Sequence, residues 1–159
     1  MKKNFLVTTS LPDSWEADQN NFILGRWCEF HEKDNYDKKI IEKINIIKNP
    51  DHWGDLTKRV QDREYLEKKI EYLLEIVSEK LSIIHDAEEN KEYWRIIIYN
   101  WLASYTTTIF YKWESIRIFF EKNNDKDFFS NFLSLKDLDY LTLDHNKFND
   151  ITQKDEWNH

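Results

Sequence analysis

The fold is decided by residues 92–122, which read EYWRIIIYNWLASYTTTIFYKWESIRIFFEK. Apolar side chains would occupy almost every face of a helix with this sequence, and residues 96–111 carry no charge. A membrane-spanning helix needs about 20 such residues, whereas this run is shorter and is closely bracketed by Arg95, Lys112 and Glu114. A helix that is apolar all round without spanning a membrane is buried in the core of a protein. The stretch therefore predicts a buried central helix and no transmembrane span.

A second long helix is predicted immediately before it, over residues 56–84. Its apolar side chains step by three or four positions and mark one continuous helix face: Leu66, Ile70, Leu73, Val77, Leu81 and Ile84. Asp55 precedes this helix and Asn90 precedes the central one, and both residue types are favoured as N-terminal caps. Isoleucines at helical spacing predict a shorter helix over residues 40–47, and another helical stretch is expected over residues 128–133.

Three short runs read as β-strands because they are rich in β-branched and aromatic or other apolar side chains. They are residues 5–9, 22–24 and 138–143. A parallel connection needs about a dozen residues or more, so the first two runs are expected to pair either indirectly or through a connection that the sequence does not predict. Only two glycines and two prolines occur in 159 residues, which disfavours sandwiches and barrels because those folds need many tight turns. The predicted fold class is α/β, dominated by helices, with two or three short strands.

The charge and the cysteine content exclude several classes of function. The net charge is −7, and acidic residues interleave with the short basic groups, so nucleic-acid binding is not expected. Cys28 is the only cysteine, which rules out an internal disulfide, and no Cys/His cluster has the spacing of a zinc site. No glycine-rich phosphate loop occurs, and neither a cofactor nor a metal is predicted. The first residues do not resemble a secretory signal, so a cytoplasmic location is expected.

Two groups of candidate ligand-binding residues follow the first two predicted strands. Thr8, Thr9 and Ser10 end the first strand, and ligands usually bind at the carboxyl ends of strands in α/β folds. The alternative for these residues is a turn capped by their hydroxyls. Arg26 and Trp27 follow the second strand, where an arginine beside an indole can hold an anion or stack on a sugar ring. The alternative for this pair is a tryptophan that anchors the loop on the core.

Three further candidates lie on or near the predicted helices. His52 is close in sequence to Asp55, and a histidine near a carboxylate is suited to acid–base catalysis. The alternative is that Asp55 caps the long helix while Trp53 packs at its start. Arg95 belongs to an aromatic group that includes Trp101, and it is either a binding residue or an arginine paired with a carboxylate. No catalytic residue is assigned.

Several separated blocks, in their order along the chain, resemble a known family. They are residues 5–11, 22–28, 52–55, 93–96, 101–102, 112–114 and 155–159. The family is that of the LIC-type transferases, which are found with bacterial O-antigen and surface-carbohydrate genes. The chain departs from the family at Arg26, where an acidic residue is expected, and near Asn100, where a Gly-Pro pair is expected. Both departures weaken the case for a ligand role of those two loops.

The resemblance implies a two-lobed, glycosyltransferase-like enzyme, of which residues 1–159 form a single, incomplete N-terminal domain. In such folds the second lobe holds most of the nucleotide-sugar donor. A nucleotide sugar or glycan is therefore expected to bind only with a C-terminal lobe, and the isolated chain is expected to be inactive. The expected function of the family is a transferase reaction in surface-polysaccharide and O-antigen biosynthesis.

A second interpretation belongs to a different class of protein. The apolar stripe over residues 66–84 and the helix that follows it are also suited to binding another chain. The chain would then be a non-catalytic helical interaction module or a partner subunit. In either interpretation, apolar surface left exposed would favour self-association.

Overall fold

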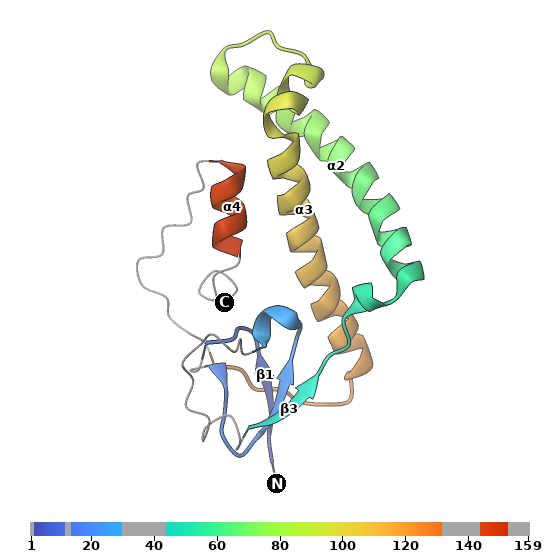
Figure 1. The fold of residues 1–159 in the computed structure, drawn as a ribbon, viewed down its shortest axis with the longest axis vertical. Helices are drawn as coiled ribbons and strands as arrows, with labels where there is room; N and C mark the ends of the chain where they lie inside the picture. Colours follow the sequence, from blue (N-terminus) through green and yellow to red (C-terminus); the bar gives the residue numbers. More distant parts are fainter. Residues whose placement is uncertain (1, 12–13, 30–43, 132–143, 153–159) are drawn as a thin grey trace.

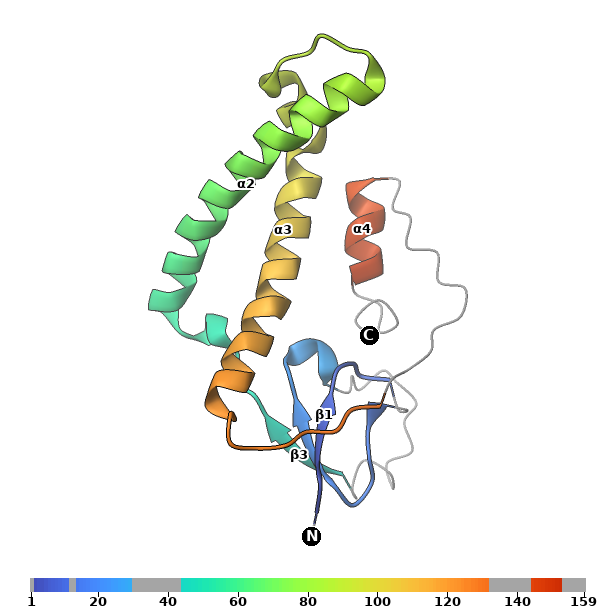
Figure 2. The same ribbon diagram turned by 180° about the vertical axis from the view of Figure 1, so that it is seen from behind.

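The structure is a computed structural model that describes residues 2–11, 14–29, 44–131 and 144–152. Three strands form a small parallel sheet, and two long helices extend from it as an antiparallel pair (Figure 1). A short third helix lies beside the second long one in both views (Figure 1, Figure 2). The elements are β1 (Asn4–Val7), β2 (Asn20–Ile23), η2 (Arg26–Cys28), β3 (Asn45–Lys48), η3 (His52–Gly54), α2 (Leu56–His85), α3 (Lys91–Lys122) and α4 (His145–Thr152). The predicted α/β class dominated by helices is confirmed.

β1 and β2 pair directly and in parallel, so of the two alternatives indirect pairing is wrong, and the strands are joined by a connection that the sequence did not predict. The strands are only four residues long, about 13 Å, and the twelve residues 8–19 are enough to return the chain to the start of β2. The buried side chain of Asn21 holds this connection. Its amide donates to the carbonyl oxygens of Glu16 at 2.7 Å and Gln19 at 3.2 Å, and its Oδ1 accepts from the Glu16 N–H at 2.9 Å.

β3 forms in a region where a helix is predicted. Residues 45–48 pair in parallel with β2, so the helix predicted over residues 40–47 is wrong in its described part. Ile40 and Ile41 lie outside the described residues. Ile47 packs against the core of the sheet. Isoleucine suits a pleated surface as well as a helix face, and the ladder with β2 decides between the two.

An extended segment lies against the other edge of β1, again where a helix is predicted. The N–H of Leu6 donates to the carbonyl oxygen of Phe129 at 2.7 Å, and the N–H of Phe129 donates to the carbonyl oxygen of Asn4 at 3.0 Å. These bonds satisfy backbone groups that the edge strand would otherwise leave unpaired. The helical prediction is therefore wrong over residues 128–131. Its remaining residues, and the strand predicted over 138–143, lie outside the described residues.

The two long helices begin and end within one or two residues of their predicted bounds. The carboxylate of Asp55 and the side-chain oxygen of Asn90 each accept, at 3.0 Å, from a backbone N–H three residues later. Both predicted caps are therefore confirmed. α4 was not predicted, and it docks through buried Phe148, whose ring lies 6.3 Å from that of Trp101 and 5.7 Å from that of Tyr105.

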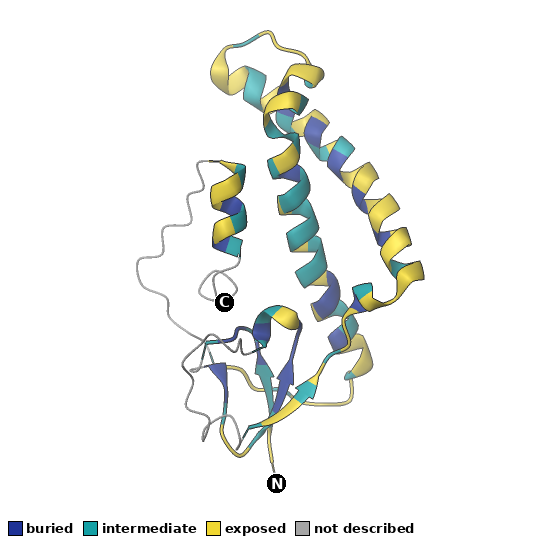
Figure 3. Cartoon of the chain, viewed as in Figure 1, coloured by how far each residue is buried: buried dark blue, intermediate teal, exposed yellow. Residues whose placement is uncertain are grey.

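α3 is central in the fold, but it is not buried on every face (Figure 3). Leu102 and Phe119 are buried, whereas Ile96 is 86% exposed and Ile97 is also exposed. The prediction of a helix buried all round is therefore wrong: within residues 96–111 only Leu102 is buried, and Tyr105 and Ile109 are exposed as well. The reason is geometric, because α2, α4 and the sheet each cover only part of the length of this helix. No described helix is long and apolar enough to cross a membrane.

The main core lies where the last turns of α3 meet the sheet. It contains Val7, Trp15, Phe22, Ile23, Leu24, Cys28 and Phe119. The ring of Phe119 lies 6.0 Å from that of Phe22 and 5.0 Å from that of Phe128, both in edge-to-face contact. This packing sets the carboxyl ends of the strands beside the second half of α3.

Candidate functional site

The carboxyl ends of the three strands lie at the edge of the sheet that faces the long helices (Figure 1, Figure 2). Because the strands are parallel, the segments that leave them come together at this edge. Six of the candidate residues belong to these segments: Thr8, Thr9, Ser10, Arg26, Trp27 and His52. The edge is therefore the candidate site.

Trp27 joins the segments that follow β1 and β2. Its indole N–H donates to the carbonyl oxygen of Thr8 at 3.1 Å. Thr9 and Ser10 are fully buried, and Oγ1 of Thr9 accepts from the N–H of Leu11 at 3.3 Å. This is the hydrogen bond of a hydroxyl-capped turn. The geometry of Thr9 therefore favours a turn-capping role over a ligand-binding role.

Gly25 allows the ring of Trp27 to lie against the backbone. A Cβ at this position would overlap the six-membered part of that ring. η2 begins at the next residue, and it leaves the side chain of Arg26 exposed while Cys28 is buried. Burial raises the pKa of the Cys28 thiol to about 12, so this side chain is a neutral member of the core. Arg26 is the part of η2 that solvent and a ligand can reach.

Asn49 fixes the segment that follows β3. Its side-chain amide donates to the carbonyl oxygens of Leu24 at 3.0 Å and Ser115 at 3.3 Å. Its backbone N–H donates to the carbonyl oxygen of Ile23 at 3.3 Å. One residue therefore connects β2, the segment after β3, and α3. The sequence does not indicate this role, because Asn49 beside a proline reads as the end of the helix predicted over residues 40–47.

His52 is buried between this segment and the helices. Its Nε2 lies 3.2 Å from the carbonyl oxygen of Tyr111. A carbonyl oxygen only accepts, so Nε2 is assigned the proton. Nδ1 lies 3.6 Å from Oδ2 of Asp62, within the range of an ion pair but too far for a good hydrogen bond. With both ring nitrogens facing protein atoms, His52 is placed to hold the segment in position.

Tyr111 is the centre of an aromatic cluster at this edge. Its ring centroid lies 4.7 Å from that of Trp53, 4.9 Å from that of His52 and 5.7 Å from that of Trp27. Burial first, and then the carboxylate of Asp51, raise the pKa of the Tyr111 hydroxyl to about 12. The hydroxyl therefore remains protonated at neutral pH, and it donates its hydrogen bond to the carboxylate of Asp51. Tyr111 was not a sequence candidate, because it reads as one more core aromatic of the central helix.

Lys112 follows directly, and its ammonium lies over the ring of Trp27, with Nζ 5.8 Å from the centroid. Burial lowers the pKa of this amine from 10.5 to about 8. A fraction of the amine is therefore unprotonated near neutral pH, which is unusual for a lysine. The sequence signal that could have indicated it is a lysine that immediately follows a long uncharged helical run.

A network of ion pairs lies beside the aromatic cluster. Lys58 Nζ lies 2.8 Å from Oδ1 of Asp62 and 2.6 Å from Oε1 of Glu114, and Arg117 makes two bonds of 2.7 Å to Glu114. Asp62 also accepts from the indole N–H of Trp53 at 3.1 Å. Asp62 and Glu114 are both buried. These ion pairs link η3 to α2 and α3, so they fix Trp53 relative to the helix that carries Tyr111.

Two of the predicted site residues do not join this cluster. Asp55 caps α2, as its structural alternative states. Arg95 lies near the other end of α3, about 24 Å along the helix from Tyr111 at 1.5 Å per residue. Its guanidinium makes two bonds of 2.6 Å to Glu71 on α2. The structural alternative, an arginine paired with a carboxylate, is therefore confirmed for Arg95. Within the described residues, no group of three His, Cys, Asp or Glu side chains could hold a metal ion.

The lowered pKa of Lys112 predicts a rise in stability between pH 8 and pH 9. The folded chain binds fewer protons at this amine than the unfolded chain does, so the free energy of unfolding increases with pH in this window. The increase should be less than about 1 kcal/mol because the amine is only partly buried, and it should be absent in Lys112→Met. Urea unfolding at both pH values measures it. The raised pKa of Cys28, and at higher pH that of Tyr111, acts in the opposite direction from just below pH 9 upwards, and does so in both proteins. An equal rise in the variant between pH 8 and pH 9 would therefore contradict the assignment.

Comparison with known proteins gives one family. Residues 4–159 match the family described as LIC12162 family transferase. No curated protein matches the sequence, and no solved structure matches it.

Proposed function

The chain belongs to the LIC12162 family of transferases, and we propose that its reaction is a glycosyl transfer in the assembly of bacterial surface polysaccharide such as O-antigen. The observation that carries the proposal is the meeting of Arg26, Trp27, Tyr111 and Lys112 at the carboxyl edge of the sheet. Aromatic side chains with a few convergent polar groups are typical of small-molecule sites. Arginine and lysine are the usual partners of phosphate.

Each of these side chains has a distinct role in the proposed site. The exposed guanidinium of Arg26 is suited to a two-bond contact with a phosphate. Lys112 supplies a second positive charge when protonated, and its neutral form can accept a proton from a hydroxyl. The hydroxyl of Tyr111, whose proton is donated to Asp51, can accept a hydrogen bond from a sugar hydroxyl. Together they would hold a sugar phosphate beside Trp27.

The nucleotide part of a nucleotide-sugar donor needs a different kind of binding site. A diphosphate is commonly cradled by a glycine-rich turn at a helix N-terminus, whereas this sequence has two glycines, and Gly25 is in contact with Trp27. The proposal therefore assigns residues 1–159 to one N-terminal domain that acts together with a second, nucleotide-binding lobe. The proposed location is the cytoplasm, which suits a reduced, buried Cys28.

An NMR titration with glucose 1-phosphate tests the binding step. We expect weak, saturable binding that shifts the indole signal of Trp27, and Arg26→Gln should weaken it by roughly threefold to tenfold because a charge-assisted bond is lost. Arg63→Gln is the matched control, since Arg63 is an exposed arginine in an α2 ion pair with Glu67. UDP-glucose should not be turned over by this chain alone.

Two outcomes would contradict the proposal. One is an equal loss of affinity in Arg63→Gln, which would mean that only the general charge matters. The other is the absence of any binding at millimolar glucose 1-phosphate, which would favour the non-catalytic interaction module instead.

A further inference from the structure

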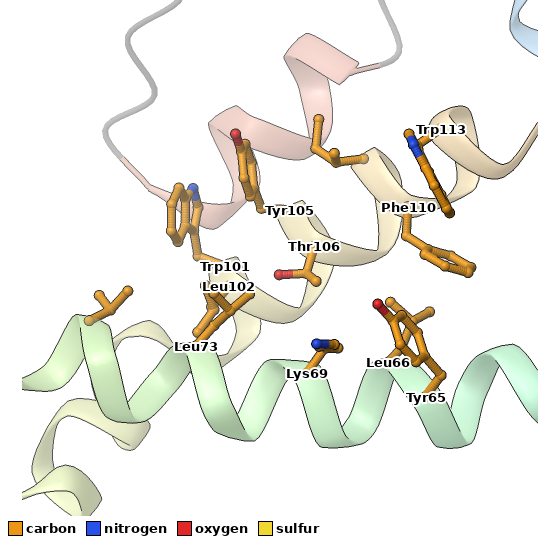
Figure 4. Close-up of a pocket in the computed structure, with 12 residues that line it drawn as sticks. Tyr65, Leu66, Lys69, Leu73, Trp101, Leu102, Tyr105, Thr106, Phe110 and Trp113 are labelled. Carbon is orange, nitrogen blue, oxygen red and sulfur yellow. The ribbon is translucent and has the colours of Figure 1, made fainter. Parts of the chain in front are cut away.

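An apolar groove of about 520 Å³ runs between α2 and α3 (Figure 4), and the residues that line it belong to these two helices and not to the segments that follow the strands. Its volume is within the range of sites that bind small molecules. The walls are largely hydrocarbon, and include Leu66, Leu73, Val77, Leu102 and Phe110. The aromatic residues Tyr65, Tyr105 and Trp113 at its rim are all more than 40% exposed. A ligand can therefore enter the groove from solvent and contact apolar side chains there.

Among the residues that the structure describes, Lys69 is the only charged one that lines the groove. The positions three and four residues away on either side hold Tyr65, Leu66, Tyr72 and Leu73, so α2 gives this lysine no carboxylate at ion-pair spacing. Among the described residues its ammonium has no ion-pair partner, and it lies 5.5 Å from the centroid of the Tyr65 ring. The neighbouring lysine, Lys68, differs, because glutamates stand four residues before it and three residues after it.

Thr106 contributes a second polar group from the opposite helix. Its Oγ1 is buried and has no hydrogen-bond partner within the described part of the chain, although a helical threonine commonly bonds to the carbonyl oxygen four residues earlier. Figure 4 shows Thr106 and Lys69 pointing into the space between the helices. A buried donor without a partner is costly, so an acceptor oxygen in the groove would be favoured.

We propose that the groove binds the hydrocarbon chain of a single-chain carboxylate, with the carboxylate at Lys69 and Thr106. The single lysine matches a single negative charge. From Lys69, the apolar wall of α2 continues through Leu73 to Val77, about 12 Å along the helix, which gives the hydrocarbon a path. A second copy of the chain, with an apolar face in the groove, would leave both polar groups without partners, which is unfavourable.

Calorimetry with the carboxylates of eight, ten and twelve carbons, each below its micelle concentration, tests the proposal. We expect one site per chain and an affinity that rises by up to roughly fourfold for each added methylene. At low salt, Lys69→Met should weaken decanoate binding by about twofold to fivefold, and it should leave the binding of decanol unchanged. Lys68→Met is the matched control and should bind decanoate as the wild type does.

A second pair of variants tests the position of the hydrocarbon. Thr106→Phe should fill the groove and abolish binding, whereas Thr106→Val keeps the shape and should retain most of it, and circular dichroism establishes that both are folded. Undiminished binding in folded Thr106→Phe would overturn the proposal, as would equal losses in Lys68→Met and Lys69→Met. A dimer in sedimentation that buries the groove and binds no decanoate would assign it to a second copy and would also overturn the proposal.

Discussion

Phe119→Ala is expected to destabilise the protein by about 3–5 kcal/mol, the usual cost of removing a buried phenylalanine. Phe119 is 2% exposed and is the residue through which α3 joins the core of the sheet. Its ring makes edge-to-face contacts with Phe22 and Phe128, which add to the area that it buries. A domain of this size has a total stability of only about 5–15 kcal/mol, so the variant should be close to unfolding at 37 °C.

Phe120→Ala is the matched control, because Phe120 is the next residue on the same helix and is 45% exposed. Its loss should cost about 1 kcal/mol or less. Chemical denaturation of both variants and the wild type measures the difference. Equal costs at the two positions would mean that α3 does not pack on the sheet as described.

The long helices were predictable because their signals are local. Asp55 and Asn90 mark the two starts, and the predicted apolar stripe of α2 contains the buried Leu66 and Ile70. The stripe misses the fully buried Leu74, and its last residue, Ile84, is 73% exposed. A cap and the helix that it begins lie within one turn of each other, so the sequence alone contains both partners of the interaction. The same reasoning fails for α4, which is short and gains its stability from contacts of Phe148 with α3.

The sheet was less predictable because its partners are distant in sequence. Ile44 and Ile47 fit a helix face, and only the ladder with β2, more than 20 residues earlier, makes this segment a strand. Phe129 pairs with β1 from 124 positions further along the chain, as the bridge to Phe5 shows. Such pairing leaves no local signature, so periodicity favoured the wrong element in both places.

The residues of the candidate site also differ in whether their signals are local in the sequence. The strand-end residues Thr8, Arg26 and Trp27 were found because they follow short apolar runs that are local signals. Tyr111 and Lys112 were missed because their importance comes from the place where α3 crosses the sheet edge, which is a property of the packing. The ion pair of Arg95 was not assignable from the sequence, because its partner Glu71 is 24 residues away, on the other helix.

Glu114→Gln is expected to destabilise the protein by about 1–3 kcal/mol at pH 7, and its effect should reach the candidate site. The Glu114 side chain is 4% exposed and binds both Lys58 and Arg117, so its removal leaves two cations without their shared partner. The cost is below that of a fully buried pair because Lys58 and Arg117 remain partly exposed. Glu67→Gln, in an exposed pair with Arg63, is the control and should cost less than about 1 kcal/mol.

The pH dependence gives this second prediction a sharper form. The bonds from Arg117, and then those from Lys58, lower the pKa of Glu114 from 4.5 to about 2. Its stabilising effect is therefore complete above pH 4.5 and is lost as the pH falls towards 2. The difference in unfolding free energy between wild type and Glu114→Gln should shrink over this range. Because Lys58 also binds Asp62, which accepts from the indole of Trp53, the variant should speed hydrogen exchange at that indole. A constant difference from pH 7 to pH 2, with no change at Trp53, would show that Glu114 does not anchor the site.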